Sequence, residues 1–487
     1  MTGVPSVRRA ATTPGGGRRV RRAPLRRGVA FLALVGSAAL TWGCRGRDAR
    51  DDAASLAQRA DALLSPLVAA HEFSGAVVLA RGDSVLYARG FGLANRAAGD
   101  PFTPDTPTDA ASMAKTFTAA ALWLLVHEGR VALDTPVVRY VAEYPHPATT
   151  VRQLVWHSNG LPDSYEFFDP HFAPGEVRTT EGLLGVVARE RPAPSFAPGT
   201  QFEYSSLGYD VAALLVERVT GRRFADVLAE RFFAPLGMTA SFARPARFAD
   251  WPGVRTMGYR WADSAWTVFD VFDGEAFVGG SNLHHSANDL SRWARAFALG
   301  LALPAEVMAR GEAWMTVSGK EVPITALSWY CDAKRERCYW TGDLNAFYSF
   351  AYWDRVRGES VVYVSNSALP MRRRAELARA LVELLAGREA QARGPSAATT
   401  FERFSDSTRA RVAGEYEVPG LGTVHLRQAG ERLVLQHDDG LAFAVFPVSP
   451  EVFFVPGTDW WLSFSGGVPP SAVQVRSVFG EWEGRRR

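Results

Sequence analysis

The sequence predicts an α/β chain of two folded parts: a larger part of mixed helices and strands, and a small all-β part at its C-terminal end. The chain has 487 residues, more than one compact domain usually holds. In the larger part, a strand hairpin over 75–90 precedes an apolar helical run over 116–127. From residue 401 onward, short strand-forming runs alternate with turns. We therefore expect two domains.

The first 44 residues are predicted to be a signal peptide or a lipoprotein leader. Residues 1–43 hold eight arginines and no acid, and residues 28–41 form an apolar stretch of the length usual in signal peptides. Cys44 follows the small Gly43, as at a bacterial lipoprotein cleavage site. Two outcomes stay open: lipidation of Cys44 with attachment to a membrane, or ordinary cleavage nearby. We expect an exported bacterial protein, periplasmic or membrane-anchored, with a polar tether over 45–55.

The net charge of the chain argues against a nucleic-acid partner. The formal charge is +3, and subtracting the eight leader arginines leaves −5 for the rest. The basic excess is therefore a targeting feature, and no basic tract elsewhere suggests nucleic acid.

A serine and a lysine three residues apart stand at the start of the apolar helical run. At that spacing Ser112 and Lys115 lie on one face of a helix, with Ser112 in its first turn. A serine hydroxyl is a poor nucleophile until a nearby base takes its proton. A lysine can be that base only where desolvation or nearby positive charge favours its neutral form. The pair therefore suggests a nucleophile and its base.

The rarity of lysine strengthens this interpretation. Lys115, Lys320 and Lys334 are the three lysines among 54 basic residues, so arginine serves almost everywhere else. Arginine stays protonated in proteins and cannot act as a base. A lysine kept beside a serine indicates a need for a removable proton, although S-x-x-K is a short motif that also arises by chance.

Cysteine usage fits an oxidising compartment. Cys331 and Cys338 flank a polar turn between two strand-like runs, so a disulfide closing this hairpin is plausible, with two free thiols as the alternative. No further ligand pattern completes a metal site there.

Several motifs in order resemble the serine β-lactamase-like superfamily. They are residues 75–79, 90–95, 112–119, 127–136, 151–162, 235–238 and 279–282. The resemblance points to the branch of class C β-lactamases, D,D-peptidases and family-VIII carboxylesterases, over a domain of residues 56–386. It implies an antiparallel sheet flanked by helices, together with an all-helical lobe. It also implies S-x-x-K as the catalytic nucleophile motif.

The resemblance places a second catalytic element at Tyr204. In the family this element reads Y-x-N, and here it reads Tyr204-Ser205-Ser206. Tyr204 would share a transferable proton with Lys115. Ser206 offers a rotatable hydroxyl where the amide of Asn would contact the substrate. The plainer alternative is a packed tyrosine before a helix.

A third element, K-T-G in many relatives, corresponds to Trp340-Thr341-Gly342, followed by Asp343. Gly342 would let a substrate approach the backbone, and the N–H groups of Ser112 and Asp343 would form the oxyanion hole. Trp340 carries no charge to anchor a substrate carboxylate, which resembles the family-VIII carboxylesterases. Trp340 as an aromatic wall residue is the alternative.

The remaining segments carry weaker signals. Residues 387–400 are predicted to be a linker, and residues 401–487 a small all-β barrel or sandwich. His284-His285 could bind a metal, but a solvated turn before a helix is the preferred interpretation. Asp343 and Glu203 are acidic groups near the predicted site, for which a surface role is favoured.

Three functions follow from these observations. The first is an exported serine hydrolase that forms an acyl-enzyme at Ser112 and hydrolyses an ester or an amide, with carboxylesterase-like activity preferred and with no metal or organic cofactor. The second is a β-lactamase or D,D-peptidase acting on β-lactams or cell-wall peptides. The third is a ligand-binding lipoprotein without catalysis. The oligomeric state is left open.

Overall fold

A computed structural model describes residues 36–161, 165–390, 405–429, 432–438, 442–449, 452–455 and 460–487. Two compact units divide the chain, Met1–Asp52 and Ala53–Arg487. Most of the predicted leader and of the predicted linker lies outside the described residues, and nothing in the structure tests cleavage or lipidation at Cys44. In the described part of the chain, no helix is both long and apolar enough to cross a membrane.

The helix α1 (Gly36–Ala69) differs from the expectation for the N-terminal segment. A tether was expected over 45–55, but this stretch is helical and continues into the predicted helix after Leu56. Its alanines and arginines are good helix formers, which explains why a polar composition did not mean an extended chain. Leu56, Ala60 and Leu64 recur at helical spacing and are buried in the second unit.

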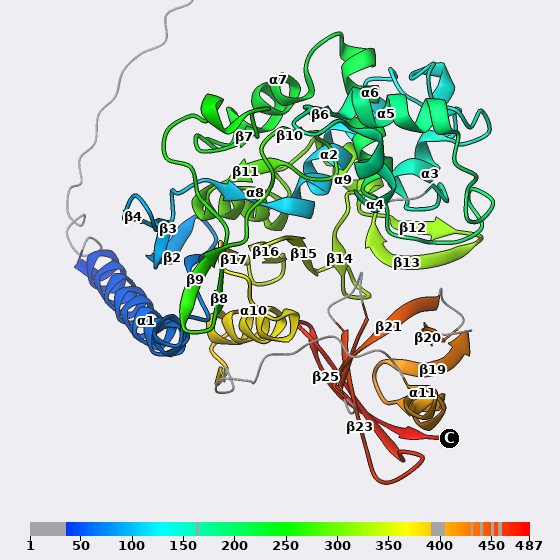
Figure 1. The fold of residues 1–487 in the computed structure, drawn as a ribbon. Coiled ribbons are helices and arrows are strands. Elements are labelled where there is room, and N and C mark those ends of the chain that lie inside the picture. The colour runs from blue at the N-terminus through cyan, green and yellow to red at the C-terminus, as the bar shows by residue number, and fades with distance from the viewer. Residues whose placement is uncertain are drawn as a thin grey trace, which may run out of the picture. The chain divides into compact units, whose positions relative to one another are not determined.

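An eight-stranded sheet forms the centre of the second unit, in the order β12-β13-β14-β15-β16-β17-β1-β2 (Figure 1). Every pair of neighbours in it is antiparallel. Its strands are β1 (Gly75–Arg81), β2 (Ser84–Phe91), β12 (Trp314–Val317), β13 (Lys320–Thr325), β14 (Tyr330–Cys331), β15 (Arg337–Leu344), β16 (Phe347–Asp354) and β17 (Glu359–Ser365). The antiparallel sheet that the resemblance implied is confirmed.

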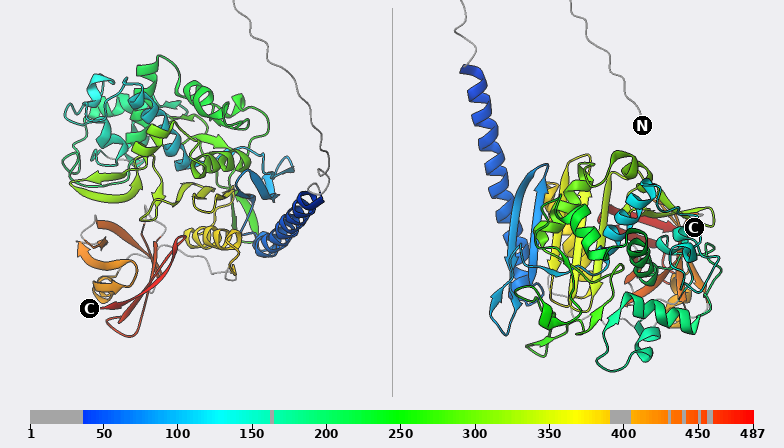
Figure 2. Two further views of the ribbon diagram at one scale, coloured as in Figure 1. Left: turned by 180° about the vertical axis from the view of Figure 1, so that it is seen from behind. Right: turned by 90° about the horizontal axis from the view of Figure 1, so that it is seen from above.

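Helices cover both faces of this sheet, which explains why its central strands are apolar throughout. β16 and β17 are buried at every position, rather than at alternate positions as in a sheet with one solvated face. α8 (Ala287–Ala298) and α10 (Met371–Leu385) pack on β17 from opposite faces (Figures 1 and 2). β1, the first strand of this domain, pairs with β17, its last strand, so that Gly75 lies opposite Ser365. The N-terminal and C-terminal ends of the domain therefore meet in the sheet.

A helical lobe stands beside the sheet and carries the predicted nucleophile helix. Its helices are α2 (Ala114–His127), α3 (Val151–Val155), α4 (Tyr165–Phe168), α5 (Thr180–Glu190), α6 (Leu207–Thr220), α7 (Phe224–Leu228) and α9 (Ala305–Gly311). α2 is almost fully buried, and it packs against α6, α7 and α9. This burial accounts for its run of apolar residues on all sides.

Short strand pairs bring distant segments of the chain together. β5 (Thr108–Asp109), β11 (Leu283–His285) and β7 (Phe242–Ala243) form a three-stranded sheet in that order. The other pairs are β3 (Leu93–Asn95) with β4 (Asp100–Pro101), β6 (Arg178–Thr179) with β10 (Glu275–Ala276), and β8 (Tyr259–Ala262) with β9 (Ala265–Val268). The three-stranded sheet ends directly before the turn that holds Ser112.

The expectation of a solvated turn at His284-His285 is wrong. Both histidines belong to β11 and are buried. Apolar neighbours exclude water here, because His285 stacks on Phe117 and His284 stacks on Phe242. Among the described residues, no group of three or more His, Cys, Asp or Glu side chains could hold a metal ion.

The C-terminal part is a closed barrel of eight antiparallel strands. They are β18 (Gly414–Val418), β19 (Gly422–Ala429), β20 (Arg432–His437), β21 (Ala442–Ser449), β22 (Val452–Val455), β23 (Trp460–Ser465), β24 (Ala472–Ser477) and β25 (Gly480–Arg486), preceded by α11 (Asp406–Val412). Buried Val, Leu, Phe and Tyr side chains fill its interior. Of the two all-β architectures predicted for this region, the structure forms the barrel.

Candidate active site

Ser112 stands in a 3₁₀ turn (Ala111–Met113) that runs directly into α2. Ala111 has a φ of +48°, a left-handed conformation that is uncommon for a residue other than glycine. No side chain caps the start of α2. The Ser112 side chain is half-buried, whereas the residues on either side of it are buried. The turn therefore presents the Ser112 hydroxyl at the surface of a buried helix.

Lys115 is completely buried and reaches three oxygen atoms. Its Nζ lies 3.2 Å from Oγ of Ser112, 3.1 Å from Oγ of Ser206 and 2.8 Å from the carbonyl oxygen of Gly280. The contacts with Ser206 and Gly280 fix the amine beside the Ser112 hydroxyl. The sequence-predicted residues Ser112, Lys115 and Ser206 thus meet around a single nitrogen.

The carbonyl that holds Lys115 is itself fixed by α6. The N–H of Gly280 donates to Oδ1 of Asp210 at 2.7 Å, and the neighbouring Gly279 carbonyl accepts from Thr118 Oγ1 at 2.7 Å. A side chain at Gly279 would meet the carbonyl oxygen of Tyr209 at 2.3 Å, which explains the glycine. The two glycines thus let this loop pass close to α2 and α6.

Tyr204 lies beside Lys115 on the loop that leads into α6. The Lys115 Nζ stands 4.8 Å from the centre of the Tyr204 ring, over its face. The ring also stacks on His157, with 4.6 Å between the two ring centres. Tyr204 is therefore close to the base, although the contact seen here is with its ring.

His157 is a residue of the site to which the sequence assigned no role. It is completely buried, and its Nδ1 accepts the N–H of Ser205 at 2.9 Å. Burial, together with the positive charge of Lys115, lowers the pKa of His157 to about 3. A neutral His157 therefore holds the segment between Tyr204 and Ser206. His157 belongs to the segment 151–162, which resembles the family, and this resemblance was the signal in the sequence that could have identified it.

Trp340 and Gly342 on β15 contact the turn that holds Ser112. The indole Nε1 of Trp340 donates to the carbonyl oxygen of Ser112 at 2.7 Å, and its side chain is 1% exposed. A side chain at Gly342 would lie 2.0 Å from the carbonyl oxygen of Ala110. That carbonyl also accepts Oγ of Ser349 at 2.7 Å.

These contacts change the role expected for two residues. Gly342 was expected to let a substrate approach, but the close approach it permits is that of β15 to Ala110. Trp340 was expected to lack the charge that anchors a substrate carboxylate, and its buried indole N–H is bound to the Ser112 backbone. Both residues hold the nucleophile turn against the sheet.

The acidic residues near the site lie at the surface. Asp343, at the end of β15, forms an ion pair with the buried Arg374 of α10, and 43% of its side chain is exposed. Glu203 is exposed. The surface role favoured for both is confirmed. The N–H of Asp343 stays a prediction for the oxyanion hole, and so does a substrate contact for Thr341, which pairs with Phe350 of β16.

A disulfide joins Cys331 of β14 to Cys338 of β15. The two residues are directly opposite each other in the strand register. Next to Cys331, Tyr330 stacks on Trp340 at a ring distance of 5.0 Å. The bridge therefore ties the outer hairpin to the strand that holds the Ser112 turn.

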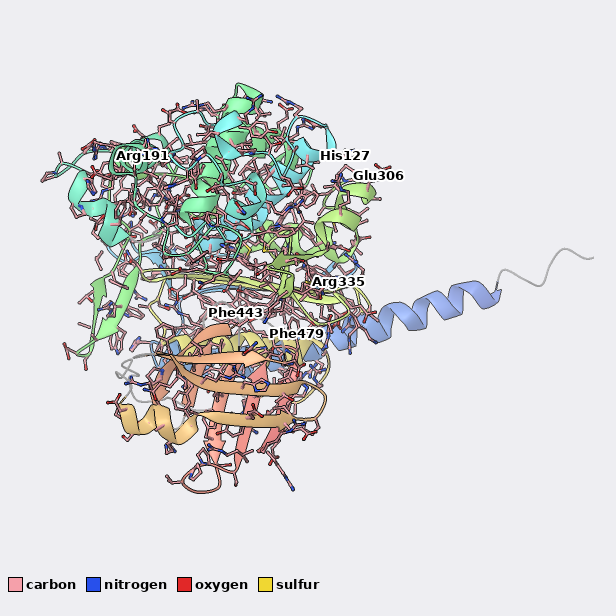
Figure 3. All side chains as sticks on the ribbon, turned by 90° about the vertical axis from the view of Figure 1, so that its right-hand side faces the viewer. His127, Arg191, Glu306, Arg335, Phe443 and Phe479 are labelled. Carbon is pink, nitrogen blue, oxygen red and sulfur yellow. A yellow bond between two sulfur atoms is a disulfide. The ribbon has the colours of Figure 1, made fainter. Side chains whose placement is uncertain are left out.

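A cleft of about 850 Å³ lies beside this disulfide, and Ser112 and Lys115 do not line it. It is lined by β13–β15 and by aromatic side chains of the barrel, including Phe443 and Phe479 (Figure 3). Phe479 packs on Tyr339, and Phe443 packs on Phe202, close to Tyr204. None of Ser112, Lys115 and Tyr204 lines this cleft, so its size does not mark the reacting centre.

The arrangement as a whole is suited to proton transfer from a serine hydroxyl. The Ser112 oxygen is accessible, and a buried amine lies within hydrogen-bond distance of it. Neighbouring side chains and carbonyls fix that amine. Such a site can activate the hydroxyl for attack on a carbonyl carbon.

Comparison with known proteins identifies the family. The family described as Beta-lactamase matches residues 60–386. Esterase EstB of Burkholderia gladioli is 37% identical over 221 residues, which cover 41% of this chain and 55% of that protein. Penicillin-binding protein 4* of Bacillus subtilis (strain 168) is 29% identical over 168 residues, 34% of this chain and 37% of that protein. The matches thus span between about a third and just over half of these relatives.

A solved structure supports the fold independently. The octameric penicillin-binding protein homologue from Pyrococcus abyssi superposes with a TM-score of 0.58. The match covers 86% of this chain and 97% of that one at 21% sequence identity. This likeness supports the fold, and the family match over two-thirds of the sequence shows that the chain belongs to the beta-lactamase family.

Proposed function

We propose that this protein is a serine hydrolase that forms an acyl-enzyme at Ser112 and preferentially hydrolyses esters. The observation that carries the proposal is the 3.2 Å contact between the Lys115 amine and the Ser112 hydroxyl. Family membership and the esterase among its relatives support the reaction class.

The reaction begins when the amine of Lys115 accepts the proton of Ser112. Oγ of Ser112 attacks the ester carbonyl carbon, and the N–H groups of Ser112 and Asp343 stabilise the oxyanion that forms. The tetrahedral intermediate then expels the alcohol, to which Lys115, with Tyr204 beside it, returns the proton. Water attacks the acyl-enzyme by the same steps and releases the acid and free Ser112.

The preference for esters rests on Trp340. In this position a lysine would offer a positive charge to a substrate carboxylate. Trp340 offers none, and its indole N–H is bound to the Ser112 carbonyl. Substrates that depend on a carboxylate anchor, such as β-lactams and cell-wall peptides, lose that contact. The penicillin-binding relative keeps them as the alternative class.

Export is part of the proposal. The arginine-rich leader supports it, and the Cys331–Cys338 disulfide fits an oxidising compartment. Attachment to a membrane through a lipidated Cys44 would follow the same route.

The test is hydrolysis of p-nitrophenyl butyrate and nitrocefin by the protein lacking its leader. We expect ester turnover that falls by at least about 10³-fold in Ser112→Ala and in Lys115→Ala, with little cleavage of nitrocefin. Circular dichroism would show that both variants are folded. Faster nitrocefin turnover would favour the β-lactam class, and ester turnover that survives in Ser112→Ala would overturn the site. A folded protein without either activity would favour the non-catalytic binder.

A further inference from the structure

Asp109 is a buried carboxylate close to Ser112 that the proposed reaction does not use. It lies three residues before Ser112, at the end of β5, and is completely buried. Its Oδ1 accepts the backbone N–H of Ala111 at 2.7 Å. A buried carboxylate is costly to keep, so the contact that it makes calls for an explanation.

The backbone that Asp109 holds is in an unfavourable conformation. Ala111 is left-handed, with a φ of +48°, and its Cβ disfavours that region. Such residues persist where the surrounding structure over-determines them. Because Ala111 directly precedes Ser112, relaxation of its φ would turn the Ser112 side chain away from Lys115.

The other contacts of the turn leave the Ala111 N–H to Asp109. Ser349 binds the carbonyl of Ala110, and Trp340 binds the carbonyl of Ser112. Both contacts hold carbonyl oxygens. Asp109 supplies the acceptor for the N–H between them. Three side chains therefore hold the turn: those of Ser349, Trp340 and Asp109.

A buried arginine, shared with Glu275, lies beside Asp109 and offsets part of its charge. The Nη1 of Arg244 lies 3.7 Å from Oδ2 of Asp109, and its Nη2 lies 3.0 Å from Oε2 of Glu275. His284 Nε2 is 3.9 Å from the same Oδ2. Burial raises the pKa of Asp109 to about 6, although Arg244 and the Ala111 N–H act in the opposite direction. Asp109 is the last residue of β5, and Arg244 directly follows β7. Both strands pair with β11, which lies between them.

We propose that Asp109 is a positioning residue that keeps Ala111 left-handed and thereby directs the Ser112 hydroxyl toward Lys115. Arg244 makes the buried carboxylate tolerable. The assignment rests on the proposed function of Ser112. Asp109 does not itself react, and its role is to orient Ser112, the residue that reacts.

The central experiment combines Asp109→Ala with Ala111→Gly. Asp109→Ala removes the acceptor, and we expect kcat for p-nitrophenyl butyrate to fall about 100-fold with little change in KM. Glycine adopts the left-handed region freely, so adding Ala111→Gly should restore about tenfold of the loss. Asp109→Asn keeps an oxygen acceptor, and its kcat should stay within about fivefold of the wild-type value.

Asp289→Ala is the matched control. Asp289 is also a buried aspartate that accepts a backbone N–H, that of Ala240 at 2.8 Å, but it makes no contact with the Ser112 turn. We expect Asp289→Ala to lower stability and leave kcat within about threefold. Equal losses of kcat in Asp289→Ala and Asp109→Ala would overturn the assignment, and so would a wild-type kcat in Asp109→Ala.

Amide hydrogen exchange at Ala111 gives a readout independent of catalysis. The Ala111 N–H should exchange at least about tenfold faster in Asp109→Ala than in the wild type or in Asp289→Ala. Unchanged exchange would contradict the assignment even in an inactive protein. If the wild type hydrolyses no ester, the proposed function fails while exchange still decides the role of Asp109. If Asp109→Ala folds only with Ala111→Gly, the assignment is supported; failure to fold in both backgrounds would oppose it.

Discussion

The helices α2 and α8 begin in contrasting ways, although both are buried and pack together. α8 is capped by its own sequence: Ser286 accepts the N–H of Asp289 at 3.1 Å. Asp289 in turn accepts the N–H of Ala240 and the hydroxyl of Ser241. α2 begins without a side-chain cap, on a turn with the left-handed Ala111.

The difference shows where the two helix starts obtain their stability. A serine that caps a helix uses its oxygen to accept a backbone N–H, and that oxygen is then committed. Ser112 instead contacts Lys115, and its turn is held by residues far away in the sequence as well as by the nearby Asp109. Trp340 and Ser349 come from strands more than 200 residues later. The cap of α8 is therefore local, although Asp289 also binds Ala240 and Ser241, whereas the start of α2 depends on the tertiary contacts of Trp340 and Ser349 together with the local contact of Asp109.

Trp340→Phe should disturb the turn before α2. Among the substitutions that compare α2 with α8, it should have the largest combined effect on stability and kcat. It removes the indole donor to the Ser112 carbonyl, a partly buried oxygen that also accepts the backbone N–H of Ala114, so the loss of this hydrogen bond should cost about 1 kcal/mol in the free energy of unfolding. Displacement of the turn should also lower kcat by at least about tenfold. Urea unfolding and ester hydrolysis measure the two effects.

Trp293→Phe is the control for that variant. Trp293 is equally buried, and its indole N–H donates to Oγ1 of Thr116, also on α2, at 3.0 Å. We expect a similar loss of stability with kcat within about threefold of the wild-type value. Equal effects of the two substitutions on kcat would mean that Trp340 only packs.

Acid should weaken both regions through buried neutral histidines. Burial lowers the pKa values of His157, near α2, and of His285, before α8, to about 3. Unfolded histidine binds a proton near pH 6.5, so stability present above that pH is lost as the pH falls toward 3. At pH 5 the loss is about 2 kcal/mol for each histidine. Asp109 acts oppositely: its raised pKa adds stability as the pH falls from about 6 to about 4.

Urea unfolding at pH 7 and at pH 5 tests this expectation. The difference between the two free energies should shrink by about 2 kcal/mol in His157→Gln, which keeps an acceptor for the Ser205 N–H. The same difference in the wild type and in His157→Gln would show that His157 is not the group that titrates.

Ser286→Ala should have the smallest effect of these substitutions. It tests whether the cap of α8 acts on that helix alone. Loss of the cap costs about 1 kcal/mol in the free energy of unfolding. Because the cap serves α8 alone, kcat for the ester should not change. A fall in kcat of more than about threefold would show that the two helix starts are coupled.

Elements with local signals were predictable from the sequence. The hairpin over 75–90 and the apolar run of α2 are there, and Cys331 and Cys338 face each other across strands as their spacing suggested. The barrel was less certain, because alternating short strands fit a sandwich as well. The helix over 45–55 was missed because polar residues carry no periodic signal.

The site residues could be predicted from the sequence only where they belong to one short motif. Ser112 and Lys115 are three residues apart, so their contact follows from helix geometry. Asp109 and Arg244 meet across three short strand segments, and no local pattern predicts such a pair. Trp340 was identified for its missing charge, whereas its indole N–H and the Ser112 carbonyl meet only in the folded chain.

The most direct test of the acyl-enzyme at Ser112 is mass spectrometry of the protein after reaction with a fluorophosphonate. We predict a single adduct on the peptide that contains Ser112, formed at least about 10²-fold more slowly in Lys115→Ala because the base is missing. An adduct on another serine, or no adduct on a folded wild-type protein, would contradict the assignment of Ser112 as the nucleophile.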